Sequence, residues 1–177
     1  MDWILKLKHM IKEEEQYRQF AYPDPLSALA KKYPAHTYGW GRRSATQILI
    51  GIDAKAEDGA PWTVGYGYTH GVLPSTEFSE GMADHKLEEV IQQSVLEVAS
   101  IVPSFKEQPD AVKAVLVDMC YNMGIKTLRQ FKTTLKAFND KNYEAAATGM
   151  EHSLWYKQVG NRAKKLVRMV RTHKFEE

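Results

Sequence analysis

The sequence predicts an α+β fold with a helix-rich lobe, and three observations support this prediction. Apolar residues recur at helical spacing near the N-terminus and through the second half of the chain. Between these regions, residues 62–69 alternate strictly between larger and smaller side chains, as in a strand. The 177 residues are 44% hydrophobic and 26% charged, which is typical of a globular chain rather than a disordered one.

The first predicted element is a helix over residues 3–20. Its apolar residues fall at helical spacing and are Ile4, Leu7 and Ile11. Asp2 precedes them as an N-cap, because its carboxylate can accept hydrogen bonds from the first free N–H groups. Pro23 and Pro25 break the helical pattern around Asp24.

A small β-region is predicted after this break. Residues 26–60 are mixed and rich in small residues, and within them Ile48, Ile50 and Ile52 alternate as in a strand. The two predicted faces of residues 62–69 carry Trp62, Val64, Tyr66 and Tyr68 on one side and Thr63, Gly65, Gly67 and Thr69 on the other. A strand face with so few side chains is expected to leave room for a ligand.

Helical periodicity dominates from Ser79 onward. One apolar stripe is formed by Leu87, Val90, Ile91, Val95 and Val98, and a second by Val112, Val115, Leu116, Met119 and Met123. The second stripe ends at Gly124, a residue type common at helix C-termini. Further helices are predicted over 131–139, 143–150 and 161–171.

Composition and motifs exclude several classes of function. A net charge of +2 is too small for binding nucleic acid through bulk charge. The six histidines include no pair spaced i, i+4, and the sequence has no nucleophile elbow or phosphate-binding loop, so neither a metal nor a cofactor is expected. Cys120 is the one cysteine; it excludes a disulfide framework and, on an apolar helix stripe, is predicted to be buried. No apolar run approaches the length that spans a bilayer.

The carboxylates are therefore the candidates for chemistry. Glu13, Glu14 and Glu15 end the first predicted helix. At about 100° per residue, Glu13 points away from the apolar stripe, whereas its two successors flank the stripe and are partly removed from water, which favours proton donation. The helical wheel leaves Glu14 and Glu15 equivalent. Asp24 supplies a second carboxylate, and two carboxylates in different environments can cleave a glycosidic bond.

Residues 10–25 and 61–69 together resemble the active-site segment of phage-type lysozymes, the T4-lysozyme family of endolysins. The family pattern is a Glu, eight residues, an Asp, and then a Thr that opens a Gly-Tyr-Gly strand. In this sequence the pattern falls on Glu15, Asp24 and Thr63, so the resemblance selects Glu15 over its neighbour.

The resemblance extends over residues 116–171 and implies a T4-lysozyme-like α+β fold. In that fold a small β-containing lobe and a helical C-terminal lobe are joined by a long helix, with a cleft between them. The whole chain, 1–177, would be a single domain. About residues 12–78 would form the α/β lobe with an insertion at 26–60, and about 79–177 with the N-terminal helix would form the helical lobe.

The activity implied by the resemblance is that of a muramidase. Such an enzyme hydrolyses the β-1,4 bond between N-acetylmuramic acid and N-acetylglucosamine in bacterial peptidoglycan, without metal or cofactor. Glu15 would match the general acid, and Asp24 with Thr63 would position a water on the far face of the sugar, which inverts the anomeric centre. Tyr121 and Thr134 match residues that line the family's saccharide cleft.

Several positions depart from the family pattern. Gln16 replaces a Gly after the general acid, and Gly149 replaces an Asn of the cleft. The insertion at 26–60 is the largest departure, and it places Asp58 at nearly the family distance before the Gly-Tyr-Gly strand as a rival second carboxylate. Asp24 is favoured because it keeps the spacing to the Glu.

The biological setting expected from the resemblance is a phage endolysin that lyses its host. The N-terminal residues lack a signal-peptide form, so we expect synthesis in the host cytoplasm, release through a holin and action in the periplasm as a monomer. The alternatives are a virion-associated lysozyme or bacterial antagonist toxin with the same chemistry, a lytic transglycosylase, and a non-catalytic peptidoglycan-binding module. The basic residues Arg162, Lys164, Lys165, Arg168 and Arg171 are interpreted as a solvated helix face, not a nucleic-acid surface.

Overall fold

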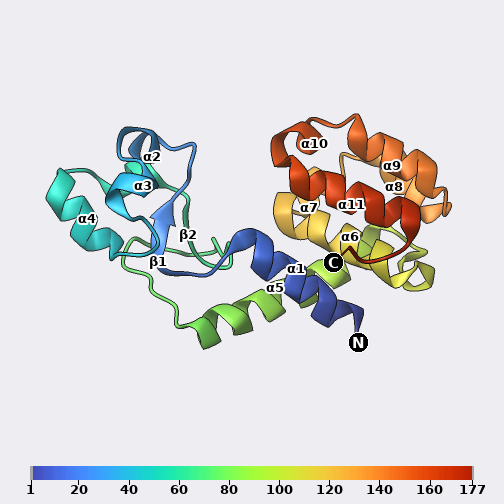
Figure 1. Cartoon of the computed structure of the whole chain (residues 1–177), viewed down its shortest axis with the longest axis horizontal. Helices are drawn as coiled ribbons and strands as arrows, with labels where there is room; N and C mark the ends of the chain where they lie inside the picture. Colours follow the sequence, from blue (N-terminus) through green and yellow to red (C-terminus); the bar gives the residue numbers. More distant parts are fainter. Residues whose placement is uncertain (1, 177) are drawn as a thin grey trace. The chain divides into compact units, whose positions relative to one another are not determined.

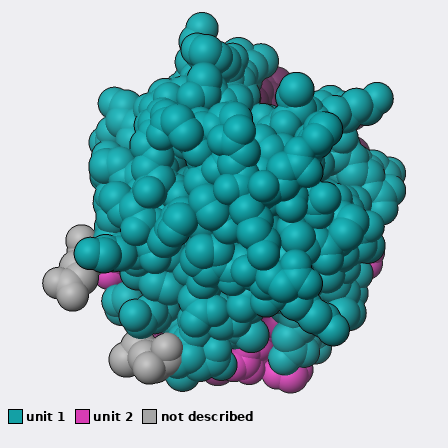
Figure 2. Space-filling view, turned by 90° about the vertical axis from the view of Figure 1, so that its right-hand side faces the viewer, with its two compact units in different colours: residues 1–10, 89–177 teal, residues 11–88 magenta. Residues whose placement is uncertain are grey.

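The long helices α1 (Trp3–Glu15) and α5 (Glu80–Ile101) each belong in part to two units of the structure (Figures 1 and 2). This computed structural model describes residues 2–176. The sheet unit comprises residues 11–88, and the helical unit comprises the described residues before and after that range. The presence of both strands and helices confirms the α+β class, whereas the single-domain organisation stays a prediction.

The sheet unit is built around two antiparallel strands, β1 (Arg18–Pro23) and β2 (Trp62–Gly65), in which Tyr22 lies opposite Thr63. The chain between the strands forms α2 (Ala28–Lys32), α3 (Ala35–Tyr38), α4 (Ala45–Ile52) and the 3-10 turn η1 (Ala56–Gly59) (Figure 1). The apolar core joins both parts and contains Ala21, Leu29, Trp40, Ala45, Ile48, Trp62, Val64 and Val72. The insertion at 26–60 is therefore packed onto the sheet.

The predicted helix over 3–20 is correct at its start and too long at its end. Asp2 Oδ1 accepts a hydrogen bond from the Ile4 N–H at 3.2 Å, which confirms the N-cap. Helix α1 ends at Glu15 because Gln16 has a φ of +55° and leaves the helical conformation. The residues that follow pair with β2, since their aromatic side chains favour a strand and their backbone groups gain ladder hydrogen bonds.

The strand predicted at Ile48, Ile50 and Ile52 is wrong, because these residues lie in helix α4. The Ile48 side chain is 4% exposed, whereas that of Ile50 is 83% exposed. In a strand these two side chains would share a face, but in a helix they point about 200° apart. Burial of Ala45 together with Ile48 follows the helical spacing instead.

The open strand face predicted over residues 62–69 is also wrong. Strand β2 stops at Gly65, where the chain turns back on itself, and Gly65 and Gly67 have φ values of +67° and +82°. The two glycines therefore supply turn conformations that other residues adopt at a cost. A Cβ on Gly65 would lie 3.1 Å from Ala83 Cβ, so this face is covered by the same unit.

The helical unit confirms the helices predicted for the second half of the chain. After α5 come the 3-10 turn η2 (Phe105–Glu107), α6 (Asp110–Met123), α7 (Ile125–Leu128), α8 (Lys132–Asn139), α9 (Tyr143–Glu151), α10 (Leu154–Val159) and α11 (Asn161–Thr172). Helix α6 is buried over most of its length and packs against α11, and α11 also packs against α9. Across residues 2–176, no helix combines the length and apolar character that crossing a membrane requires.

A bidentate ion pair lies inside this helical packing. Arg162 donates from Nε to Asp118 Oδ1 at 3.0 Å and from Nη2 to Asp118 Oδ2 at 3.2 Å. The two side chains are 8% and 1% exposed. Arg168 forms a separate ion pair with Glu176. Lys164, Arg168 and Arg171 are exposed at helical spacing and form the predicted solvated face, whereas Arg162 is buried and does not belong to it.

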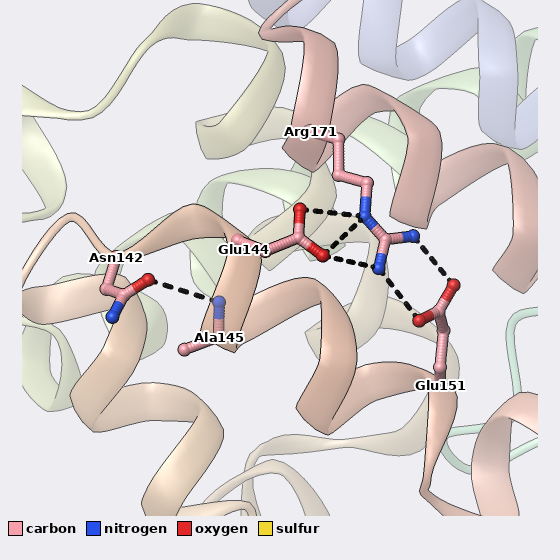
Figure 3. Close-up of polar contacts among 5 residues, drawn as sticks. All are labelled: Asn142, Glu144, Ala145, Glu151 and Arg171. Atoms are coloured by element: carbon pink, nitrogen blue, oxygen red, sulfur yellow. Dashed lines mark hydrogen bonds and ion pairs between the residues drawn. The ribbon is translucent and has the colours of Figure 1, made fainter.

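A second ion-pair cluster joins α11 to α9 at the surface (Figure 3). The Arg171 guanidinium contacts Glu144 at 2.9 Å and Glu151 at 2.7 Å. Hydrogen bonds from Arg171 hold the pKa of both carboxyl groups below their ordinary value, and the carboxylates in turn raise the pKa of Arg171. The cluster therefore links the two helices while both carboxylates are ionised.

Replacing Arg171 with Gln should lower the melting temperature slightly at pH 7, and the difference should shrink in acid. The folded-state pKa values of Glu144 and Glu151 are lowered, so their contribution is present above the ordinary carboxyl pKa of 4.5 and is lost as pH falls through the folded values. The cluster is partly exposed, so salt should also weaken it. Melting curves of both proteins between pH 7 and pH 3 test this; a difference that is constant with pH contradicts it.

Candidate active site

Glu15 is placed at the C-terminal end of α1, on the wall of a pocket of about 620 Å³. Its side chain is half-buried, whereas those of Glu13 and Glu14 are exposed. The pocket lies wholly within the sheet unit, and its volume is in the range of small-molecule binding sites. The geometry thus supports Glu15 where the helical wheel alone could not choose.

Tyr22 is a further residue of the candidate site, and it was not predicted from the sequence. Tyr22 lines the same pocket and lies directly opposite Thr63 in the sheet. Burial, followed by the negative charge of Glu15, raises the pKa of Tyr22 to about 12. Tyr22 therefore remains protonated and uncharged at neutral pH. Its position opposite Thr63 depends on the register of the two strands, which the sequence alone does not reveal.

Asp24 follows β1 in a turn, and its side chain is half-buried. Its Oδ1 accepts a hydrogen bond from the Leu26 N–H at 2.7 Å, and its own N–H donates to the Gly59 carbonyl at 3.0 Å. The rival residue Asp58 precedes Gly59 in the 3-10 turn η1 and is exposed. The two candidate carboxylates therefore belong to chain segments that meet in the fold, and neither is among the pocket-lining residues that the structure describes.

The insertion forms the second wall of the Glu15 pocket. The lining residues from it include Pro34, His36, Trp40 and Arg42. Trp40 is 4% exposed, donates from Nε1 to the Tyr33 carbonyl at 2.7 Å and packs against the Trp62 ring at a centroid distance of 5.8 Å. The wall is thus held by the core of the sheet unit.

The residue after Glu15 adopts a left-handed conformation, although it is Gln16 and not the glycine expected from the family pattern. The Gln16 N–H still donates to the Lys12 carbonyl at 3.0 Å, and its φ is +55°. A side chain in this conformation costs about 1–2 kcal/mol. Gln16 therefore adds backbone strain beside Glu15.

Replacing Gln16 with Gly should raise the melting temperature by about 1–4 °C. Relief of the left-handed strain outweighs the greater chain entropy of glycine by about 0.5–1 kcal/mol. Gln16→Ala is the matched control, because it also removes the side-chain contact with Arg18 at 3.3 Å but keeps the Cβ. Differential scanning calorimetry of the three proteins should place only the glycine variant above the parent; an equal gain for alanine would refute the strain.

The two predicted saccharide contacts, Tyr121 and Thr134, lie in the helical unit. Tyr121 is half-buried at the end of α6. Thr134 lines a pocket of about 710 Å³ with Gly149, but it is 6% exposed, and a Cβ on Gly149 would collide with its hydroxyl group. Any side chain at position 149 would therefore collide with Thr134, which explains why a glycine fits there. The role of Tyr121 and Thr134 in saccharide binding stays a prediction.

Cys120 is buried, as expected, with a side chain 3% exposed. Its Sγ donates to Glu97 Oε2 at 3.5 Å. Burial raises the pKa of the thiol to about 12, and the Glu97 carboxylate adds to the increase, so the reactive thiolate is disfavoured. Within residues 2–176, no three His, Cys, Asp or Glu side chains gather into a group that could hold a metal ion.

Comparisons with known proteins place these observations in a family. The sequence model described as phage lysozyme matches residues 51–173. The chain is 26% identical over 101 residues to "Probable T4-type lysozyme 1" of Dictyostelium discoideum, covering 57% of this chain and 58% of that protein. It is 36% identical over 58 residues to "Peptidoglycan hydrolase gp36" of Pseudomonas phage phiKMV, covering 33% of this chain and 6% of that protein. The chain thus spans less than two thirds of each relative.

The family match covers only some of the candidate residues. Its range contains Thr63, Tyr121 and Thr134 and begins after Glu15 and Asp24. The roles of the two carboxylates therefore depend on the sequence pattern and on the geometry of the sheet unit.

Proposed function

The chain belongs to the phage lysozyme family, and on this premise we propose that it is a muramidase that hydrolyses the β-1,4 bond between N-acetylmuramic acid and N-acetylglucosamine in peptidoglycan. The observation that carries the proposal is a half-buried carboxylate, Glu15, on the wall of a pocket that Tyr22, the cross-strand partner of Thr63, also lines. Hydrolysis of a glycosidic bond requires a carboxylic acid that can donate a proton to the leaving oxygen of the bound sugar.

The roles follow from the chemistry of an oxocarbenium-like transition state. Glu15 donates its proton to the leaving oxygen, so that the sugar leaves as an alcohol. Asp24 and Thr63 hold the attacking water, and the negative charge of Asp24 stabilises the positive charge that develops on the ring. Tyr22 acts as a positioning residue, because it pairs with Thr63 across the sheet and lines the pocket of Glu15. Attack from the face opposite the acid inverts the anomeric centre.

The experiment that tests the function is incubation of the purified chain with purified peptidoglycan, followed by mass spectrometry and NMR of the products. Hydrolysis predicts reducing-end muramic acid, formed initially as the α anomer. Anhydro-muramic ends would instead indicate lytic transglycosylation. An initial β anomer would be consistent with hydrolysis but would contradict inversion. Absence of any cleavage would leave only a peptidoglycan-binding module.

Asp24→Asn should reduce peptidoglycan hydrolysis by at least about 100-fold, whereas Asp58→Asn should remain nearly as active as the parent. The substitution keeps the size of Asp24 and the acceptor for the Leu26 N–H, so it removes charge rather than the turn. Initial rates of the two variants on the same substrate measure the difference. The reverse result would assign the second carboxylate to Asp58, on the neighbouring segment.

The proposed setting is host lysis by a phage endolysin that acts as a monomer in the periplasm after release through a holin. The test compares Gram-negative cells with and without chloroform treatment. Lysis from outside only after membrane disruption supports the proposal, as does lysis on co-expression with a holin. Recovery of the chain in purified virions would favour the virion-associated alternative.

A further inference from the structure

The pocket that holds Glu15 also has a basic wall, which the proposed chemistry does not use. Arg18 comes from β1, and His36 and Arg42 come from the insertion. Glu15 is the one carboxylate among the pocket-lining residues that the structure describes. Two guanidinium groups, charged at any physiological pH, therefore face a single carboxylate.

The positive charges of this wall are not neutralised by the surrounding protein. Within residues 2–176, no ion pair joins Arg18 or Arg42 to a carboxylate, in contrast to Arg162, Arg168 and Arg171 of the helical unit. A pocket with a surplus of guanidinium groups favours an anionic ligand, and the planar donors of arginine suit a carboxylate.

Arg18 is held in place beside the reacting groups. Its aliphatic part lies against Gly41, where an added Cβ would be 2.8 Å from Arg18 Cδ. The Gly41 carbonyl accepts a hydrogen bond from the Phe20 N–H of β1 at 3.2 Å, which fixes this part of the insertion to the strand. The positive charge of Arg18 partly offsets the rise in the pKa of Tyr22, so Arg18 and Glu15 both act on the same hydroxyl group.

We propose, on the basis of the muramidase function, that Arg18 and Arg42 bind a carboxylate carried by the muramic acid residue of the substrate. Such carboxylates occur on the lactyl group or on the peptide attached to it, and an unsubstituted chitin-like glycan lacks both. The insertion thereby makes the enzyme specific for the charged substituents of peptidoglycan. The neutral sugar rings remain the substrate of Glu15 and Asp24.

The test measures binding to the Glu15→Gln variant, which does not consume its ligand. Three probes are titrated by calorimetry: the GlcNAc–MurNAc disaccharide with a free lactyl carboxylate, the disaccharide with its peptide, and that disaccharide-peptide with every carboxyl group amidated. Adding Arg42→Gln should weaken at least one of the two charged probes by about tenfold and leave the amidated probe within twofold. The charged probe that loses affinity identifies the source of the carboxylate.

The matched control is Arg43→Gln, which removes the same charge from the next residue. Arg43 is exposed like Arg42 but is not among the pocket-lining residues described by the structure, so its loss should change every dissociation constant by less than twofold. Equal losses for the two arginine variants, equal losses for charged and amidated probes, or no binding of any probe would overturn the proposal. Charge-dependent binding by a chain that does not cleave peptidoglycan would overturn the muramidase function alone.

Discussion

Replacing Glu15 with Gln is expected to abolish peptidoglycan hydrolysis, with a loss of about 10² to 10⁴ in rate. The amide is nearly the same size as the carboxyl group but cannot donate the proton that the leaving oxygen requires. The side chain is only half-buried at the end of α1, so the fold should survive. Initial rates of turbidity loss, with circular dichroism and a melting curve on the same samples, measure both effects.

Glu14→Gln is the matched control for this experiment. It makes the same chemical change one residue earlier, on an exposed side chain of the same helix. The control should retain most of the activity. An inactive Glu14 variant beside an active Glu15 variant would mean that the sequence pattern is displaced by one residue.

The second large effect is expected from Asp118→Ala, which should destabilise the chain by about 3–5 kcal/mol. The substitution leaves the Arg162 guanidinium, which is 8% exposed, without its bidentate partner inside the packing of α6 against α11. For a chain of this size the loss corresponds to a fall of about 6–20 °C in melting temperature. Calorimetry and urea denaturation give two independent measurements of the same quantity.

Two controls separate the buried charge from simple truncation. The double variant Asp118→Leu with Arg162→Met replaces the pair by apolar side chains and should recover most of the loss. Lys136→Ala breaks an exposed ion pair with Asp140 and should change stability by less than about 1 kcal/mol. A double variant as unstable as Asp118→Ala would show that the buried Arg162 charge, once its bidentate carboxylate is removed, is not the cause.

The helical half of the fold could be predicted from the sequence, whereas the region around the sheet could not. Helix α6 carries an uninterrupted apolar stripe and stops at Gly124, so periodicity alone defines it. The elements of the insertion are too short for periodicity to decide, and Ile48 and Ile52 satisfy both a strand and a helix. Gly65 and Gly67 adopt turn conformations, and Gly65 also lies close to Ala83. The contact with Ala83 depends on how distant parts of the chain pack, so the sequence around Thr63 does not reveal it.

The same distinction applies to the candidate site. The spacing of Glu15 and Asp24 is a property of the sequence, so these two candidates could be predicted from it. The part played by Tyr22 depends on the register of β1 against β2, which brings it opposite Thr63 from forty residues away. The basic wall could not be predicted either, because no sequence pattern marks Arg18 and Arg42 as neighbours. They line the same pocket only because the insertion folds onto β1.

The backbone hydrogen bond from Asp24 to Gly59 means that the chain leaves the sheet and returns to it at one neck. Each doubling of the length of a loop costs only about 0.6 kcal/mol of closure entropy, so a long segment at this position adds little to the cost of folding. Burial of Leu29, Trp40 and Ile48 offsets this cost from within the excursion itself. The segment is therefore stabilised largely by its own side chains, and grafting it between two paired residues of a lysozyme with a short connection should transfer this wall of the pocket as a unit.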